Sequence, residues 1–250
     1  MSEGPAKERS ELYYFCDESS FLGEEYMAVG GIAVSRNALG TVVKELLAIN
    51  EAKRARGEIK WHNTRKRGVE VRKAYIDYLM KQIAANYLHF HIRFSPMNEY
   101  DHEGERREFE TVSKMFYQLL LHRPVRYYGK SCVLRIRPDD GECTRRLPDF
   151  KDALHTDGQL TYEAESNCIH SIVPQSSRHQ PMLHLLDVMV GALTAYRNGR
   201  HLLDAIAEPK RTLAQYAFDA FGKRDLKISR DEGNKLSVWN VIPKKKTLER

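Results

Sequence analysis

The chain of 250 residues is long enough to bury a substantial core, and its content of 42% hydrophobic and 30% charged residues is typical of a globular protein. No apolar run approaches the roughly 18 residues that a membrane helix needs, and the polar start of the chain lacks the apolar core of a signal peptide. The sequence therefore predicts a cytoplasmic protein with no membrane segment. Its formal charge of +6 favours a polyanionic partner such as DNA or RNA.

Strands and helices are expected to alternate along most of the chain after a polar leader over residues 1–11. In chain order, we expect strands at 12–16 and 26–34, a helix at 36–56 ended by Gly57, a helix from the basic run 65–67 to about 86, a strand at 87–94, a helix at 105–122, a strand at 131–136, a helix at 145–155, a strand at 167–173, helices at 180–196 and 210–221, and a final segment at 235–241. The first two strands are predicted to form an antiparallel hairpin. The pattern predicts one α/β domain with a mixed sheet over 12–242, followed by a basic tail over 243–250.

Histidine and cysteine patterns do not favour a soft-metal site. The strand at 87–94 alternates apolar and polar residues, which predicts that one face is less buried; His89 and His91 are therefore expected at the surface rather than on a metal ion. The four cysteines, Cys16, Cys132, Cys143 and Cys168, show no Cys-x-x-Cys spacing. Cys16, Cys132 and Cys168 lie in apolar, strand-like runs, and we expect them to be reduced thiols in the core.

The segment at 180–196 is apolar on nearly all sides, as expected for a buried helix. One face of this helix carries small or polar residues, spaced three or four apart: Gln180, His184, Asp187, Gly191, Thr194 and Asn198. A solvated face would carry Lys and Glu, whereas this one carries a single carboxylate. Asp187 therefore either satisfies a structural hydrogen bond or is presented to a site.

Other carboxylates follow predicted elements elsewhere in the chain. They are Asp17 and Glu18 after the first strand, Glu58 after the first long helix, and Asp139 or Asp140 after the strand at 131–136. Each also has a structural explanation, because Asp-Glu-Ser and Pro-Asp-Asp-Gly are favourable turn sequences. In a mixed α/β sheet, however, helical connections bring strand ends together, and the carboxylates can then converge with Asp187.

Converging carboxylates repel one another and need cations. Oxygen ligands without Cys or His suit Mg²⁺ or Mn²⁺. Two such ions about 4 Å apart can generate hydroxide and stabilise the attacking and leaving oxygens in phosphodiester cleavage. The constellation thus favours a metal-dependent nuclease acting on DNA or RNA.

Four short motifs spread over residues 12–241 resemble a known family. They are Tyr14-Phe15-Cys16-Asp17-Glu18-Ser19, Glu58-Ile59-Lys60-Trp61, Leu183-His184-Leu185-Leu186-Asp187-Val188 and Lys235-Leu236-Ser237-Val238-Trp239. Together they resemble the bacterial family called domain of unknown function 3800, whose fold is similar to ribonuclease H. The resemblance implies a ribonuclease H-like mixed sheet with helices on both faces and a metal-dependent acidic site.

The resemblance also implies roles for the acidic residues. Asp17 would bridge both metal ions, and Asp139 and Asp187 would each complete the coordination of one. Glu58 would be a further ligand or would position water. Glu18 is a second-rank metal ligand, because the neighbour of Asp17 on a strand points to the other side of the sheet.

Basic residues would then contact the nucleic acid. Lys60 would neutralise phosphate charge as a point-charge partner. Arg65, Lys66 and Arg67 would follow the phosphate backbone, although such a run is most often a solvated face.

Two departures from the family pattern leave an alternative open. Ser20 stands where the family has Gly, and His184 stands where it has Gln and could supply an extra metal or phosphate contact. They favour a catalytically weak ribonuclease H-like component that binds nucleic acid or regulates, as in phage defence or a mobile element. A phosphotransferase ranks last, because it would need a phosphate-cradling glycine loop and Gly30-Gly31 lies within a strand.

Overall fold

The computed structural model describes residues 9–19, 23–97 and 108–242. These residues contain one seven-stranded sheet in the order β5-β4-β1-β2-β3-β7-β6, with antiparallel β1-β2, β2-β3 and β6-β7 pairs and parallel β1-β4, β4-β5 and β3-β7 pairs. The strands are β1 (Ser10–Ser19), β2 (Tyr26–Ser35), β3 (Leu88–Pro96), β4 (Cys132–Pro138), β5 (Ile169–Ile172), β6 (Arg230–Asp231) and β7 (Leu236–Asn240). The α/β class, the mixed sheet and the antiparallel hairpin are confirmed; β6 was not expected.

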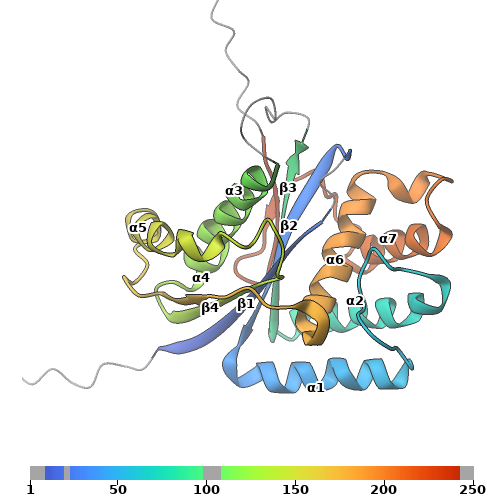
Figure 1. Cartoon of the computed structure of the whole chain (residues 1–250), viewed down its shortest axis with the longest axis horizontal. Coiled ribbons are helices and arrows are strands. Elements are labelled where there is room, and N and C mark those ends of the chain that lie inside the picture. Colours follow the sequence, from blue (N-terminus) through green and yellow to red (C-terminus); the bar gives the residue numbers. More distant parts are fainter. Residues whose placement is uncertain (1–8, 20–22, 98–107, 243–250) are drawn as a thin grey trace, which may run out of the picture.

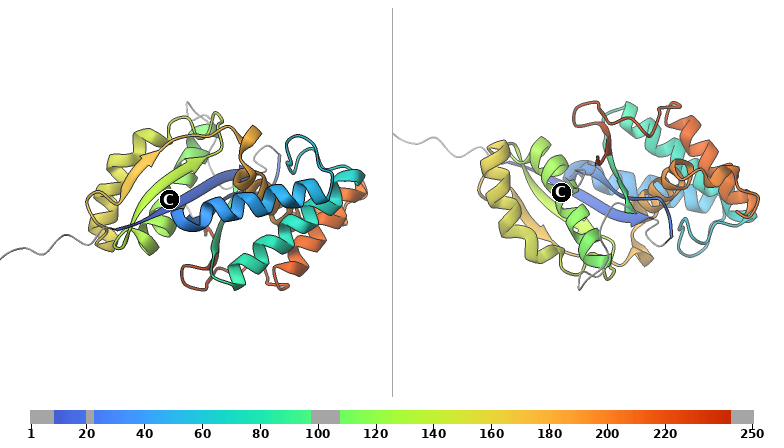
Figure 2. Two further views of the ribbon diagram at one scale, coloured as in Figure 1. Left: turned by 90° about the horizontal axis from the view of Figure 1, so that it is seen from below. Right: turned by 90° about the horizontal axis from the view of Figure 1, so that it is seen from above.

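Helices cover both faces of the sheet (Figure 1). On one face lie α1 (Arg36–Ala52), α2 (Val69–Ala84), α6 (Pro181–Arg197) and α7 (Glu208–Ala220). On the other face lie α3 (Glu108–Leu120), α4 (Arg126–Tyr128) and α5 (Lys151–Tyr162). A π-helical turn at Leu121–Val125 joins α3 to α4, and 3₁₀ turns occupy Lys66–Gly68, Leu147–Phe150, Ser177–His179 and Arg200–Leu202. Figure 2 shows the two helical layers from below and above the view of Figure 1.

Strand alternation creates a separate apolar core on each face. In β1, Tyr14 and Cys16 pack towards α3, whereas Phe15 packs towards α6. The strand continues through Asp17 and Glu18 to Ser19, beyond the expected end at Cys16. Asp17 therefore lies on the α6 face of a regular strand, and not in a turn after it.

Helix α6 is confirmed as the buried helix. Every residue from Pro181 to Ala195 is buried except Asp187. Gly30 of β2 allows the helix to lie close to the sheet, because a Cβ atom at Gly30 would lie 2.4 Å from Cγ2 of Val190. The glycine in the strand thus fixes how near Asp187 comes to the strand ends.

Helix α1 ends at Ala52, four residues before the expected end. The chain leaves the helix because Arg54 adopts a left-handed conformation, with φ of 50°, and Gly57 adopts another, with φ of 72°. The amide of Arg54 still donates to the carbonyl of Glu51 at 2.9 Å. These turns direct the chain back over α2 and α6.

The expectation of a less buried face on β3 is wrong. His91 is fully buried and Arg93 is 5% exposed, because α3, α4 and β7 cover this part of the sheet. His91 contacts the Tyr14 hydroxyl at 3.2 Å and the Asn234 carbonyl at 2.9 Å. Burial lowers the pKa of His91 to about 3, so the ring is a neutral core residue and not a surface one.

Two further expectations need correction. The expected helix at 145–155 becomes a 3₁₀ turn followed by α5, which begins at Lys151, because Pro148 lacks an N–H and is accommodated only at a helix start. Cys16, Cys143 and Cys168 are buried free thiols, whereas Cys132 is only half-buried. Ser20, the start of the helix expected at 105, and the basic tail lie outside the described residues.

Within the described ranges, no helix is long and apolar enough to cross a membrane.

Replacing Gly31 by Ala is expected to lower the free energy of unfolding by about 1–3 kcal/mol. Its Cβ atom would lie 2.3 Å from the ring of Tyr14, which is fully buried and cannot move aside. Gly40→Ala in α1 is the control, because a Cβ atom there meets nothing within 4 Å and helix propensity favours Ala. Urea unfolding measures both, and equal effects at the two positions would contradict the packing described here.

Candidate active site

The pairing of β1 with β4 brings Asp17 and Asp139 together. Cys16 lies beside Pro138 in the parallel register, and the amide of Asp139 donates to the carbonyl of Cys16 at 2.9 Å. Asp17 and Asp139 are therefore the next residues on neighbouring strands and lie on the same face of the sheet, towards α6.

The Pro-Asp-Asp-Gly sequence separates the roles of its two acids. The side chain of Asp139 is 14% exposed and contacts Lys60, whereas Asp140 is exposed. The amide of Asp140 donates to Oδ1 of Asp139 at 3.0 Å, and the hydroxyl of Thr144 donates to the Asp139 carbonyl at 2.5 Å. The turn thus holds Asp139 in place, and the structure brings Asp139 rather than Asp140 to the other acids.

Asp187 meets the segment that follows α1. Its Oδ2 accepts a short hydrogen bond from the amide of Trp61. One turn further along α6, Gly191 makes room for the Trp61 side chain, because a Cβ atom there would lie 2.3 Å from Cγ of Trp61. Gly191 therefore allows the segment with Trp61 to pack against α6. The same segment carries Glu58 and Lys60.

The last two positions of the stripe are structural. The hydroxyl of Thr194 donates to the carbonyl of Val190 at 2.6 Å. The side chain of Asn198 accepts from the amide of Tyr26 at 2.9 Å and donates to its carbonyl at 2.8 Å. Asn198 thus fastens α6 to the start of β2, whereas the Thr194 bond lies within the helix. Asp187 and His184 are the residues of the stripe that lie near the other acidic residues.

Lys60 is the cation of the site. Its Nζ lies 2.9 Å from Oδ2 of Asp139 and 3.8 Å from Oε1 of Glu58. Burial by itself would lower the pKa of Lys60, but the hydrogen bond to Asp139 and the charges of Asp139, Asp17 and Asp187 outweigh it and raise that pKa. Lys60 therefore stays protonated and neutralises part of the carboxylate charge.

Arg72 of α2 holds the segment that carries Lys60. Its guanidinium donates to the carbonyl of Lys60 at 2.6 Å and to the carbonyl of Gly68 at 2.9 Å, and it also bonds the Asn63 side chain. Arg72 is 4% exposed. Sequence reasoning missed this residue, since an Arg within an amphipathic helix gives no signal that its side chain fastens a distant loop.

Glu58 lies at the edge of the site. Its Oε1 accepts a 2.5 Å hydrogen bond from the hydroxyl of Ser177, which lowers the pKa of Glu58 despite partial burial. Glu58 also lines a cavity of about 530 Å³ with Arg178 and His184. Ser177 was not expected to take part, and its place in the loop before α6 is the signal that could have indicated it.

His184 is buried beside Glu58 and adds no charge to the site. Burial lowers its pKa, so the ring is neutral. Neither ring nitrogen forms a hydrogen bond of normal geometry with a described residue. His184 is thus close to the acids, as expected, but no metal or phosphate contact is preformed on it.

The carboxylates are short of positive charge. Burial, followed by the charges of Glu18, Asp187 and Asp139, raises the pKa of Asp17 well above its usual value. Burial and the charge of Asp139 raise the pKa of Glu18 to about 7. Burial also raises the pKa of Asp187 to about 6, although the Trp61 amide and Lys60 oppose it. Glu18 points to the turn around Gly141, on the side away from α6.

These residues fit a hard divalent cation in donor chemistry and in charge. Carboxylate oxygens are the ligands of Mg²⁺ and Mn²⁺, and a cation would oppose the burial and the repulsion that together raise the three pKa values. Among the described residues, no three His, Cys, Asp or Glu side chains are already arranged as ligands of one ion. The ion pair of Lys60 with Asp139 accounts for part of this, because it directs one carboxylate towards an ammonium group.

Arg65, Lys66 and Arg67 lie apart from the carboxylates. All three are exposed at the 3₁₀ turn before α2, and Arg65 and Arg67 line a different cavity. The structure therefore brings together Asp17, Glu18, Glu58, Lys60, Asp139, His184 and Asp187, and leaves the basic run outside this group. No protein-family model and no curated protein matches this chain.

Replacing Asp187 by Asn is expected to stabilise the protein more at about pH 8 than at about pH 5, by roughly 1 kcal/mol in the absence of divalent ions. The pKa of Asp187 is raised from 3.8 to about 6 in the folded state. The stability linked to its proton is therefore present at low pH and is lost as the pH rises through 6. Asn mimics the neutral acid at every pH.

Urea unfolding of the variant and the wild type in EDTA measures this difference. The contributions of buried histidines such as His91 cancel in the comparison. A stability difference that is the same at both pH values would contradict a desolvated Asp187 carboxylate.

Proposed function

We propose that the protein is a divalent-metal-dependent nuclease that hydrolyses phosphodiester bonds of DNA or RNA. The observation that carries the proposal is the meeting of Asp17, Asp139 and Asp187, from two strand ends and a buried helix, around the ammonium group of Lys60. The raised pKa values of Asp17 and Asp187 support the proposal, because a further cation would balance the charge of these carboxylates.

The fold supports a ribonuclease H-like assignment. The antiparallel β1-β2-β3 unit is followed by parallel β4 and β5, with helices on both faces, as that resemblance requires. The acids lie at the ends of the central strand β1 and its parallel neighbour β4, together with α6 packed on them. In open α/β sheets this end of the strands is where ligands bind.

The roles of the acids follow from their positions. Asp17, central among the carboxylates, would bind both ions, and Asp139 and Asp187 on either side would each hold one. Bound Mg²⁺ or Mn²⁺ supplies an activated water and stabilises charge on the phosphate. Glu58, fixed by Ser177, would position water or act as a further ligand at the edge of the site, and Glu18 would be a reserve ligand on the other side of β1.

Lys60 has two successive partners in this proposal. In the structure its ammonium neutralises Asp139 and Glu58. Once a cation has taken over that neutralisation, Lys60 is free to contact the substrate phosphate as a point charge. The long, flexible side chain and the backbone contact with Arg72 allow the ammonium to move while the segment stays fixed.

Asp17→Asn and Asp187→Asn are each expected to reduce metal-dependent cleavage by about a hundredfold or more, because each removes a charge that fixes the cation opposite the phosphate. Labelled single- and double-stranded DNA and RNA with Mg²⁺, Mn²⁺ or EDTA provide the assay. Asp140→Asn is the matched control, since Asp140 is exposed beside the site. Cleavage that persists in EDTA or in both variants would rule out this mechanism.

Replacing Lys60 by Ala is expected to tighten Mn²⁺ binding by about fivefold, because the ion no longer competes with a partly buried ion pair on Asp139. Cleavage should fall at the same time. Electron paramagnetic resonance of free Mn²⁺ measures the affinity, and Lys66→Ala, which removes an exposed charge nearby, is the control. Unchanged or weaker Mn²⁺ binding in Lys60→Ala would show that the two cations do not share the site.

A second candidate is a catalytically weak component that binds nucleic acid. The close pairing of Lys60 with Asp139 favours it, since a lysine that permanently replaced the metal would leave a folded but inactive site. This candidate predicts salt-dependent binding that is the same for the wild type and Asp17→Asn, with no cleavage of any of the four substrates.

A further inference from the structure

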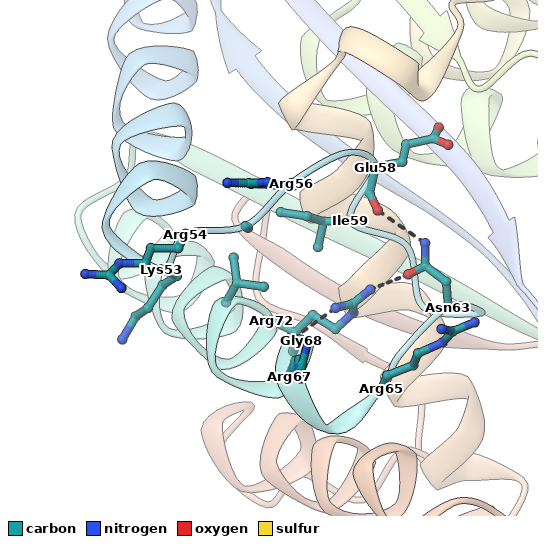
Figure 3. A pocket seen from close by; sticks show the side chains of 12 residues that line it. Lys53, Arg54, Arg56, Glu58, Ile59, Asn63, Arg65, Arg67, Gly68 and Arg72 are labelled. Carbon is teal, nitrogen blue, oxygen red and sulfur yellow. Dashed lines mark hydrogen bonds between the residues drawn. The ribbon is translucent and has the colours of Figure 1, made fainter.

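A second cavity, of about 380 Å³, lies beside the carboxylate site and carries the opposite charge (Figure 3). It is formed by the end of α1, the following turn, and the 3₁₀ turn before α2. Its basic lining residues are Lys53, Arg54, Arg56, Arg65, Arg67 and Arg72, and its single acid is Glu58. The left-handed conformations of Arg54 and Gly57 turn the chain back after α1 and so shape this side of the cavity.

The cavity has an excess of unpaired positive charge. Within the described ranges, none of Lys53, Arg54, Arg56, Arg65 or Arg67 forms an ion pair, and their side chains are exposed. Figure 3 shows Lys53 and Arg54 on one side of the cavity and Arg65 on the opposite side, with Arg72 between them. Five like charges gathered around one hollow repel one another, and an anion is the ligand that relieves this repulsion.

The sixth basic residue is already engaged. Arg72 uses its guanidinium on the carbonyls of Lys60 and Gly68 and on the Asn63 side chain, so it forms the floor and is not available to a ligand. Ile59 and Val71 contribute apolar side chains to the lining and Asn63 a polar one, and none of the described lining residues is aromatic. A site with several cations and no stacking surface suits a sugar-phosphate backbone, not a base.

Glu58 joins the cavity to the carboxylate site. It lines the cavity, while its carboxylate lies 3.8 Å from the ammonium of Lys60 and points away from the basic side chains (Figure 3). Lys60 in turn contacts Asp139 at 2.9 Å. Only Glu58 therefore separates the basic cavity from Lys60, and a polyanion bound in the cavity could extend along the chain surface to the carboxylate site.

We propose that this cavity binds the phosphodiester backbone of the polynucleotide substrate, without reading its bases, and so positions the strand for the carboxylate site. The proposal rests on the proposed function and adds Lys53, Arg54 and Arg56 to the basic run as parts of one subsite. Arg65 and Arg67 belong to it, whereas Lys66 does not line the cavity.

The test compares two triple variants that each remove three positive charges. Arg54→Asn/Arg65→Gln/Arg67→Gln alters the cavity, and Asn at position 54 tolerates the left-handed φ of 50°. Lys44→Gln/Lys114→Gln/Lys227→Gln removes exposed charges outside the cavity. Binding of fluorescein-labelled, mixed-sequence DNA and RNA, single- and double-stranded, is followed by anisotropy in EDTA over a range of salt concentrations. Thermal unfolding verifies that both variants are folded.

The cavity variant is expected to bind at least about tenfold more weakly at low salt, with the slope of log affinity against log salt reduced by about 1 per charge removed. The control variant should change much less, and Arg65→Gln alone should reduce the slope by about 1. Equal losses in the two triple variants, no loss in the cavity variant, or wild-type protein that binds none of the four nucleic acids would each overturn the proposal.

The binding assay contains no metal ion, so its result is separate from that of the cleavage assay. Cavity-dependent binding without cleavage in Mg²⁺ or Mn²⁺ would sustain the subsite and reject the nuclease. Cleavage by a cavity variant that binds like the control would sustain the nuclease and reject the subsite.

Discussion

The ion pair between Lys60 and Asp139 is the interaction on which the arrangement of the site depends. It places one ammonium among carboxylates that the fold has removed from water, and a single positive charge is too little to neutralise them. Burial and mutual repulsion consequently raise the pKa values of Asp17 and Asp187. Such strain is costly to a folded protein and is typical of sites where a ligand completes the charge balance, which is the role proposed for the cation.

Close packing between α6 and its neighbours enforces that arrangement. Gly30 lets the helix approach the sheet, and Gly191 lets the segment with Trp61 lie on the helix. The Trp61 amide then bonds Asp187, and Arg72 fixes the same segment from the other side. The two glycines and the two backbone contacts thus hold the loop between α1 and α2 in place, so that the loop forms one side of the site. The same loop also lines the exposed basic cavity.

Much of the fold and part of the site could be predicted from sequence. Alternation and apolar runs indicated the hairpin and α6, and the single carboxylate on a buried helix singled out Asp187. The alternation of polar and apolar residues gave the wrong burial for His91. Its polar neighbours suggested a surface strand, but α3, α4 and β7, which are distant in sequence, cover it. The sequence pattern also missed Arg72 and Ser177, because contacts between a side chain and a remote loop leave no periodic signal.

Diffraction from crystals soaked in Mn²⁺, recorded at a wavelength where manganese scatters anomalously, would show whether the acidic residues bind a metal ion. We expect manganese bound to Asp17 together with Asp139 or Asp187, with the ammonium of Lys60 turned away from Asp139. An acidic site that takes up no manganese, with Lys60 still paired to Asp139, would contradict a metal-dependent site and leave a lysine-neutralised, non-catalytic one.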